Sequence, residues 1–160
     1  QSRMILSYIY TITGRLKLAE FELNKLIEEG FESPQVFSNF SYIYFETGKI
    51  EKSIEYLYRA LDLDSDNATA LNSIGYILAD KNIDPSKAVD FCRQALKKRP
   101  ENPAYLDSLG WAYFRLGEND EARHYLKRAF ELSSGNKVIS AHLRTVIDEI
   151  ERLNKEKLNN

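Results

Sequence analysis

Residues 105–117 read YLDSLGWAYFRLG, a stretch in which an aromatic residue, Trp111, stands six positions before a turn-forming glycine, Gly117. The same spacing from aromatic to turn residue occurs three more times in the chain, at Tyr8 and Gly14, Tyr42 and Gly48, and Tyr76 and Asn82. Consecutive turn residues are 34, 34 and 35 positions apart. Self-similarity with a fixed period of this length is typical of one supersecondary unit repeated along a chain.

The residues before each turn have the spacing of one helix face. Eight positions before the turn stands a large apolar residue (Leu6, Phe40, Ile74, Leu109), and seven before it a small one (Ser7, Ser41, Gly75, Gly110). A second large residue four positions before the turn (Tyr10, Tyr44, Leu78, Tyr113) completes the three-to-four spacing of an amphipathic helix. A large residue beside a small one predicts a close contact between helices.

A second helix is expected after each turn, with small residues where the two helices cross. Its apolar positions are Ala19, Ser53, Ala88 and Ala122, then Leu23, Leu57, Cys92 and Leu126, then Leu26, Ala60, Ala95 and Ala129. Small side chains let antiparallel helices approach to about 8–10 Å between axes. The third unit holds an extra residue near Asn82, but asparagine tolerates the left-handed conformation that glycine supplies in the other turns.

The composition is that of an ordered helical protein. Of the 160 residues, 43% are hydrophobic and 29% charged, with only seven Gly and four Pro, which favours an all-α fold. The formal charge of −2 argues against a nucleic-acid partner, because affinity for phosphate backbones comes from clustered Lys and Arg. No apolar run approaches the roughly 20 residues that cross a bilayer, and no charged-then-apolar targeting segment opens the sequence.

No arrangement of residues points to catalysis, a metal or a cofactor. His124 and His142 stand apart from any cysteine or acid pair at ligand spacing, and we expect both to be solvated helix residues. Cys92 occupies an apolar helical position and is expected in the core. The acidic run at 62–66 resembles the start of a calcium loop but lacks its glycine. We therefore expect a protein that is not an enzyme and holds no cofactor.

The stretch 105–117, followed by Asp120-Glu121-Ala122 and Ala129, resembles the tetratricopeptide repeat (TPR) family, and the resemblance covers nearly the whole chain. It implies an all-α, right-handed solenoid of antiparallel helix pairs, in a single domain over residues 1–160. The units would be a divergent first repeat over 1–33, repeats over 34–67, 68–102 and 103–136, and a capping helix over 137–158. Residues 74–80 and 106–117 are also similar to TPR proteins common in bacteria, many of them exported, which favours a periplasmic or outer-membrane-associated location over a cytoplasmic one.

In TPR proteins the first helix of each pair lines a concave groove, and the resemblance assigns to that groove Tyr8, Gln35, Asn39, Tyr42, Phe45, Asn72, Tyr76, Asp107, Trp111, Phe114 and Arg115. Arg115 is the single cation of this set, which argues against the capture of a C-terminal carboxylate. The set fits an extended peptide or a docked helix, with Asn39 and Asn72 hydrogen-bonding to its backbone. The alternative is that the aromatic rings pack within the stack and only their polar edges meet water.

The two ends of the stack differ. From residue 138 to 158 the apolar residues Ile139, Leu143, Val146, Ile147, Ile150 and Leu153 form one stripe, as a capping helix requires. The first helix is apolar nearly all round. We expect its face bearing Ile5, Ile9 and Ile12 to be covered by preceding repeats, a second copy of the chain or a partner, unless this apolar surface is merely tolerated.

These patterns leave three classes of function open. The first is a non-catalytic scaffold that binds a peptide or helix segment of a partner protein in its groove. The second is a structural module that oligomerises through its apolar N-terminal helix. The third is a non-catalytic regulatory segment of a larger enzyme.

Overall fold

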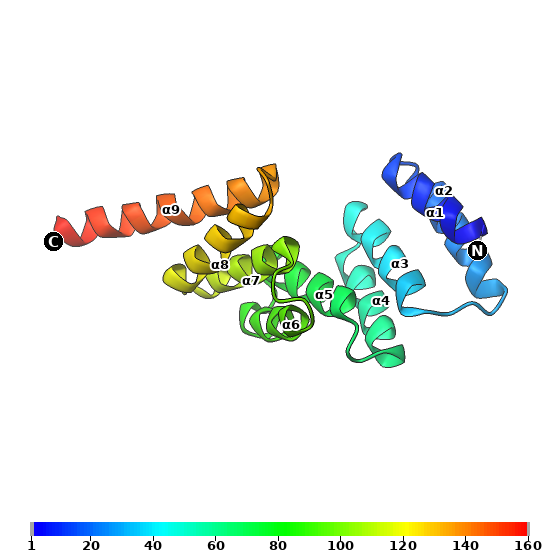
Figure 1. Ribbon diagram of the computed structural model, residues 1–160. Helices are drawn as coiled ribbons and strands as arrows, with labels where there is room; N and C mark the ends of the chain where they lie inside the picture. Colours follow the sequence, from blue (N-terminus) through cyan, green and yellow to red (C-terminus); the bar gives the residue numbers. More distant parts are fainter. Residues whose placement is uncertain (1, 160) are drawn as a thin grey trace. The chain divides into compact units, whose positions relative to one another are not determined.

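The computed structural model describes residues 2–159, which form nine α-helices joined by short turns and contain no strand (Figure 1). The helices are α1 (Ser2–Ile12), α2 (Leu16–Glu28), α3 (Pro34–Glu46), α4 (Ile50–Leu63), α5 (Ala68–Asp80), α6 (Pro85–Lys98), α7 (Pro103–Leu116), α8 (Asn119–Leu132) and α9 (Lys137–Leu158). The predicted all-α fold class is confirmed. The expected domain limits at residues 1 and 160 lie outside the described range.

The helices belong to two compact units, the first ending at Ser73 and the second beginning at Ile74, within α5. In the first unit α1 packs on α2 and α3 packs on α4, and the two pairs meet where α2 contacts α3. In the second unit α7 packs on α6 and α8, and α9 contacts both α7 and α8. Each unit therefore has its own set of packed helix layers.

Local sequence signals start several of these helices. Ser33, Asp84 and Asn102 cap α3, α6 and α7, and each accepts a hydrogen bond from a backbone N–H three residues later. A proline follows each cap at the first helical position, where its missing N–H needs no partner. These cap–proline pairs fix where the chain enters each helix.

The turns between paired helices share one backbone geometry. The turn residues Gly14, Gly48, Asn82 and Gly117 have φ angles of 72°, 75°, 53° and 91°. After each of them, a backbone N–H donates to the carbonyl five residues earlier over 2.7–3.0 Å, from Arg15, Lys49, Ile83 and Glu118. This bond closes the end of the first helix. The left-handed conformation predicted for Asn82 is confirmed.

In three helix pairs, the small residue of the first helix lies against the second helix. A Cβ atom added at Gly110 would lie 2.7 Å from Cγ of Leu126, and one added at Gly75 would lie 2.5 Å from Sγ of Cys92. In the α3–α4 pair, Ser53 Oγ donates to the Ser41 carbonyl over 2.8 Å and lies 2.9 Å from Ser41 Oγ. The predicted close crossings are confirmed in these three pairs.

The core follows the predicted pattern except in α1. All twelve second-helix positions named from the sequence are buried. Among the large first-helix residues, Phe40, Ile74 and Leu109 are buried, whereas Leu6 is 38% exposed. Leu6 is therefore less buried than the prediction for this position requires.

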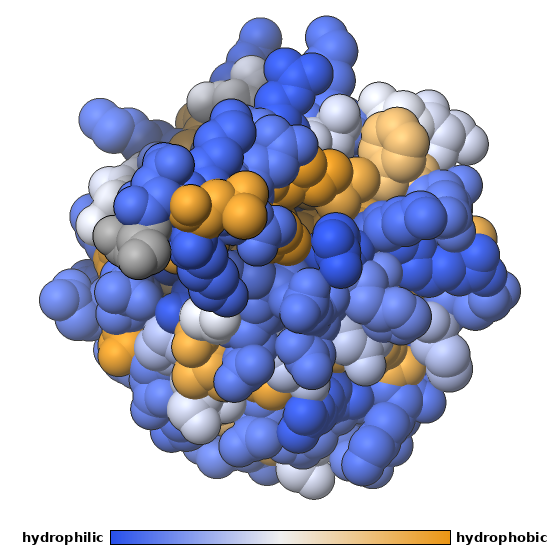
Figure 2. All heavy atoms as spheres, turned by 90° about the vertical axis from the view of Figure 1, so that its left-hand side faces the viewer, coloured by the Kyte–Doolittle hydropathy of each residue, from blue (hydrophilic) through white to orange (hydrophobic). Residues whose placement is uncertain are grey.

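The long helix α9 packs by one stripe of apolar residues. Asn136 caps it, accepting from the N–H groups of Val138 and Ile139 over 2.9 and 3.2 Å. Ile139 and Val146 are buried, and Ile147, at the edge of the stripe, is 38% exposed. Figure 2, which looks from the side on which the chain ends, shows a largely hydrophilic surface with narrow apolar patches.

Candidate functional site

In the first unit, α3 carries several of the expected groove positions. Tyr42 is 48% exposed in the middle of this helix. One turn before it, Asn39 Oδ1 accepts a hydrogen bond from Gln35 Nε2 over 2.8 Å, a bond that does not involve the Asn39 amide nitrogen. Partial burial and the carboxylate of Glu46 raise the pKa of Tyr42, which keeps its hydroxyl protonated. This face offers an aromatic ring beside hydrogen-bond donors.

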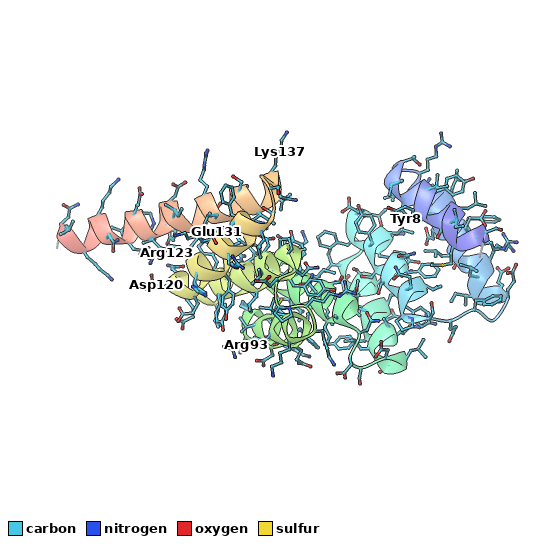
Figure 3. All side chains as sticks on the ribbon, viewed as in Figure 1. Tyr8, Arg93, Asp120, Arg123, Glu131 and Lys137 are labelled. Atoms are coloured by element: carbon cyan, nitrogen blue, oxygen red, sulfur yellow. The ribbon has the colours of Figure 1, made fainter. Side chains whose placement is uncertain are left out.

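Other expected positions of the first unit differ in accessibility. Tyr8 is 61% exposed on α1 (Figure 3), and Phe45 is half-buried on α3. Asn72 Oδ1 on α5 and Ser38 Oγ on α3 are buried without a hydrogen-bond partner in the described part of the chain. Buried polar atoms normally have hydrogen-bond partners. A further polar group, such as a water molecule, would satisfy Asn72 Oδ1 and Ser38 Oγ.

In the second unit, side chains from three helices form an aromatic cluster, which we define as Tyr76 of α5, Trp111 and Phe114 of α7, and His142 of α9. The His142 ring stacks on the Trp111 indole, with centroids 4.2 Å apart and planes at 16°. The centroid distance is 6.5 Å from His142 to Tyr76 and 5.1 Å from Trp111 to Phe114. Tyr76 and Trp111 are half-buried, so these two rings are less open than Tyr42.

His142 also holds the carboxylate of Asp107. Its Nδ1 lies 2.9 Å from Asp107 Oδ1, with side chains 13% and 8% exposed. The prediction that His142 is a solvated helix residue is wrong, because α9 packs across α7 and brings the ring onto Trp111. Asp107, assigned to the groove by the resemblance, is buried and bonded to His142. It is therefore not an open carboxylate in this structure.

Beside the aromatic cluster, a cleft of about 470 Å³ opens between α7 and α9. It is lined by Asn82, Phe114, Arg115, Gly117, Asn119, Glu149 and Leu153. Glu149 accepts two hydrogen bonds from Arg152, over 2.8 and 2.7 Å, and this pairing lowers the pKa of Glu149. Nε of Arg115 and Nε1 of Trp111 are buried, and neither has an acceptor within the described residues.

The described residues do not bring together the ligands of a metal site. Residues 2–159 contain no cluster of three or more His, Cys, Asp or Glu side chains able to hold a metal ion. Burial, with a smaller effect of the Asp107 carboxylate, raises the pKa of Cys92 to about 12, so its thiol stays protonated. In the same range, no helix combines the length and apolar character that crossing a membrane requires.

His142 is the site residue that sequence reasoning missed, although the sequence holds a signal for it. The repeat period applied beyond the last turn places His142 34 positions after Ser108, at an offset where first helices face the groove. We expected α9 to be a capping helix with a polar outer face, and therefore did not align it with the first helices of the repeats. Extending the register of the repeats into α9 places His142 at a groove-facing offset.

Sequence comparison finds TPR matches in two segments of the chain. A family model described as a TPR repeat matches residues 42–82, and another described as a tetratricopeptide repeat matches residues 103–136. The chain is 35% identical over 98 residues to the TPR repeat-containing protein PA4667 of Pseudomonas aeruginosa. That match covers 61% of this chain but 16% of the relative, so the chain spans about a sixth of the length of the curated relative.

Solved structures of low sequence identity share the fold. TTC0263, a thermophilic TPR protein of Thermus thermophilus, has a TM-score of 0.81 at 18% identity, covering 96% of this chain and 84% of that one. The first TPR of Spaghetti (RPAP3), bound to the HSP90 peptide SRMEEVD, has a TM-score of 0.66 at 20% identity, covering 74% of this chain and 93% of that one. These similarities concern the arrangement of helices.

Proposed function

Because the chain belongs to the tetratricopeptide repeat family, we propose that it is a non-catalytic scaffold that binds a peptide or helical segment of a partner protein along its first helices. The neighbouring structure of the Spaghetti TPR holds a peptide, which supports this use of the fold. The residues proposed to contact the segment are Tyr8, Gln35, Asn39, Tyr42, Phe45, Asn72, Tyr76, Trp111, Phe114 and Arg115, with Asp107 positioning His142.

The exposure of Tyr42 is the observation that carries this proposal. A large aromatic ring in the middle of a packed helix is nearly half exposed, next to an Asn39 amide nitrogen that the bond to Gln35 does not involve. If a ligand covered about 100 Å² of such a ring, about 25 cal/mol per Å² would contribute about 2.5 kcal/mol. Several rings together would offset the ordering and association costs of binding.

Peptide selection tests the proposal. Random dodecamer peptides are selected on the full chain by phage display, and their affinity is measured by fluorescence anisotropy. We expect Tyr42→Ala and Trp111→Ala each to weaken binding about tenfold. Tyr58→Ala removes an exposed tyrosine from a second helix, α4, and should leave the affinity within about twofold. The proposal would be contradicted if the selected peptides bound the Tyr42→Ala and Trp111→Ala variants with unchanged affinity.

A second candidate function is self-assembly through α1. Ile5, Ile9 and Ile12 are 60%, 43% and 64% exposed, and their spacing places them on one helix face. A second copy of the chain covering this face would remove that apolar surface from water. We expect sedimentation to show concentration-dependent association that Ile5→Glu with Ile9→Glu abolishes. Leu158→Glu, at an 85% exposed residue of α9, is the control, and a monomer at every concentration would exclude this candidate.

A further inference from the structure

Helix α1 carries isoleucine at two offsets where the other first helices carry polar residues. Nine positions before the turn stands Ile5, and the other repeats have at this offset Asn39, Ser73 and Ser108. Two positions before the turn stands Ile12, and the other repeats have at this offset Glu46, Asp80 and Arg115. Both offsets belong to the proposed binding face, and Tyr8 lies between them at the offset of Tyr42. The part of this face that α1 contributes is therefore apolar.

The three side chains form an exposed surface, which we define as the apolar strip: Ile5, Tyr8 and Ile12. They are 60%, 61% and 64% exposed, and steps of three and four positions keep them on one side of α1. Helix α3, which contacts α1 within the same unit, carries the exposed Tyr42 at the matching offset. A ligand can therefore reach every one of these side chains from solvent.

Glu46 adds a negative charge on α3, at the offset that Ile12 occupies on α1. Its side chain is exposed, and it forms no ion pair with a cation of the described residues. Partial burial and then the Glu46 carboxylate raise the pKa of Tyr42, which places this carboxylate near the Tyr42 hydroxyl. The surface is thus apolar on α1 and acidic on α3, and it is complementary to a ligand with apolar residues and a basic one.

The chemistry of the apolar strip favours a helical ligand over an extended one. The side chains of Ile5 and Ile12 have no polar atom. An extended peptide lying on them would lose water from its backbone N–H and C=O groups without gaining hydrogen-bond partners. A helix forms these bonds internally, and one face of it presents apolar residues at three-to-four spacing.

We propose that the segment bound by α1 and α3 is an amphipathic helix of a partner protein, with its apolar face on the apolar strip and a lysine or arginine paired with Glu46. The apolar contact supplies affinity by removing both surfaces from water. The ion pair at the edge fixes the direction in which the helix lies. This inference rests on the proposed scaffold function, because it names the chemistry of the segment that the first helices bind.

The experiment selects random peptides of about 20 residues on the full chain by phage display, because shorter helices are marginal in water. We expect the selected peptides to carry apolar residues at three-to-four spacing together with Lys or Arg. Circular dichroism should show that they gain helix on binding. Binding that produces no helix would overturn the inference in favour of an extended segment.

Polar substitutions in the apolar strip test the apolar contact. Ile5→Asn gives α1 the residue that α3 has at the same offset, and Ile12→Gln replaces the second isoleucine by a neutral polar side chain. Each should weaken binding about tenfold in fluorescence anisotropy, because the peptide then covers less apolar surface. Leu18→Asn, at an exposed leucine of α2, is the matched control and should leave the affinity within about twofold.

Charge reversal tests the pair at the edge. Glu46→Lys should weaken the selected peptides about fivefold. Exchanging the basic residue of the peptide for glutamate should strengthen binding to this variant and weaken binding to the unmodified chain. Glu55→Lys, at an exposed acid of α4, changes the net charge equally and should leave the affinity within about twofold. Equal effects of the two reversals would overturn the inference.

The outcomes separate this inference from the proposed function. Peptides that depend on Tyr42 and Trp111 but bind the two isoleucine variants with unchanged affinity would overturn the inference and leave the scaffold function standing. A free chain that forms dimers in sedimentation, and that Ile5→Asn makes monomeric, would also overturn it, because a second copy then covers the apolar strip. Peptides that depend on neither the aromatic rings nor the isoleucines would overturn both.

Discussion

The imidazole ring of His142 lies flat on the indole ring of Trp111, with the ring centroids 4.2 Å apart. The same imidazole bonds to the buried carboxylate of Asp107 over 2.9 Å. One side chain of α9 therefore covers a face of Trp111 and provides the partner of a buried acid on α7.

Replacing His142 by alanine is expected to lower the free energy of unfolding by about 1–3 kcal/mol, because Asp107 then lies buried without its partner. The emission of Trp111, the single tryptophan of the sequence, should shift to longer wavelength as one face meets water. Urea denaturation and emission spectra measure the two effects. His124→Ala is the control: this exposed residue touches Tyr125 edge-on at 5.2 Å, and we expect a change within about 0.5 kcal/mol. Equal effects of the two substitutions would contradict the contact.

Gly75→Ala is expected to lower the free energy of unfolding by about 1–3 kcal/mol through overpacking. The added Cβ would lie 2.5 Å from Cys92 Sγ and 3.0 Å from the Ala88 carbonyl oxygen. Cys92→Ala removes the sulfur but not the carbonyl, so Gly75→Ala should cost less in that background without becoming neutral. A double-mutant cycle in urea measures this coupling, and a cost independent of Cys92 would contradict the predicted crossing.

Ser53→Ala removes the hydroxyl that donates to the Ser41 carbonyl over 2.8 Å. It also leaves the buried Ser41 hydroxyl without its neighbour at 2.9 Å. We expect a loss of about 1–3 kcal/mol in the free energy of unfolding for the single change. The Ser41→Ala, Ser53→Ala double variant should be little worse than Ser53→Ala, because no hydroxyl is then left buried and unpaired. Strictly additive losses would show that the two serines act independently.

The buried thiol of Cys92 should make the fold less stable in alkali. Its pKa rises from 9.0 to about 12 on folding, so the unfolded chain releases this proton first. The unfolded state then binds fewer protons, and stability decreases as pH rises from about 9 towards 12, at up to about 1.4 kcal/mol per pH unit. Urea denaturation of the chain and of Cys92→Ala over this range isolates the thiol. Rapid alkylation of native Cys92 near neutral pH would contradict its burial.

The helices and their crossings were predictable because they depend on local signals that recur. The turn residues give the hairpins, and the pairing of a small with a large residue is enough to place Gly110 against Leu126. The turn position requires a residue that can adopt a positive φ angle rather than glycine as such, since Asn82 adopts the same left-handed conformation as the glycines of the other turns.

The surroundings of the candidate site were less predictable because they depend on α9. The offset rule treats each first helix alike and assigns Asp107 to an open groove, whereas α9 buries Asp107 beneath His142. No local feature of residues 137–158 fixes that position, since α9 packs through Ile139, which shares a core cluster with Leu106 and Ala129 of other helices. The repeat register places His142 at a groove-facing offset, but the burial of Asp107 follows only from the packing of the whole helix.

The three crossings also limit how the chain can be rearranged by design. In the α3–α4 pair two serine hydroxyl groups meet at the crossing. In the other two pairs a glycine lies against the thiol of Cys92 or against the side chain of Leu126. For example, a chimera that joined α3 to α8 would place the Ser41 side chain against Leu126, at a crossing that in the α7–α8 pair has room only for the glycine Gly110. Whole hairpins are therefore the modules to exchange, and a library that shuffled single helices would yield mostly clashes or voids.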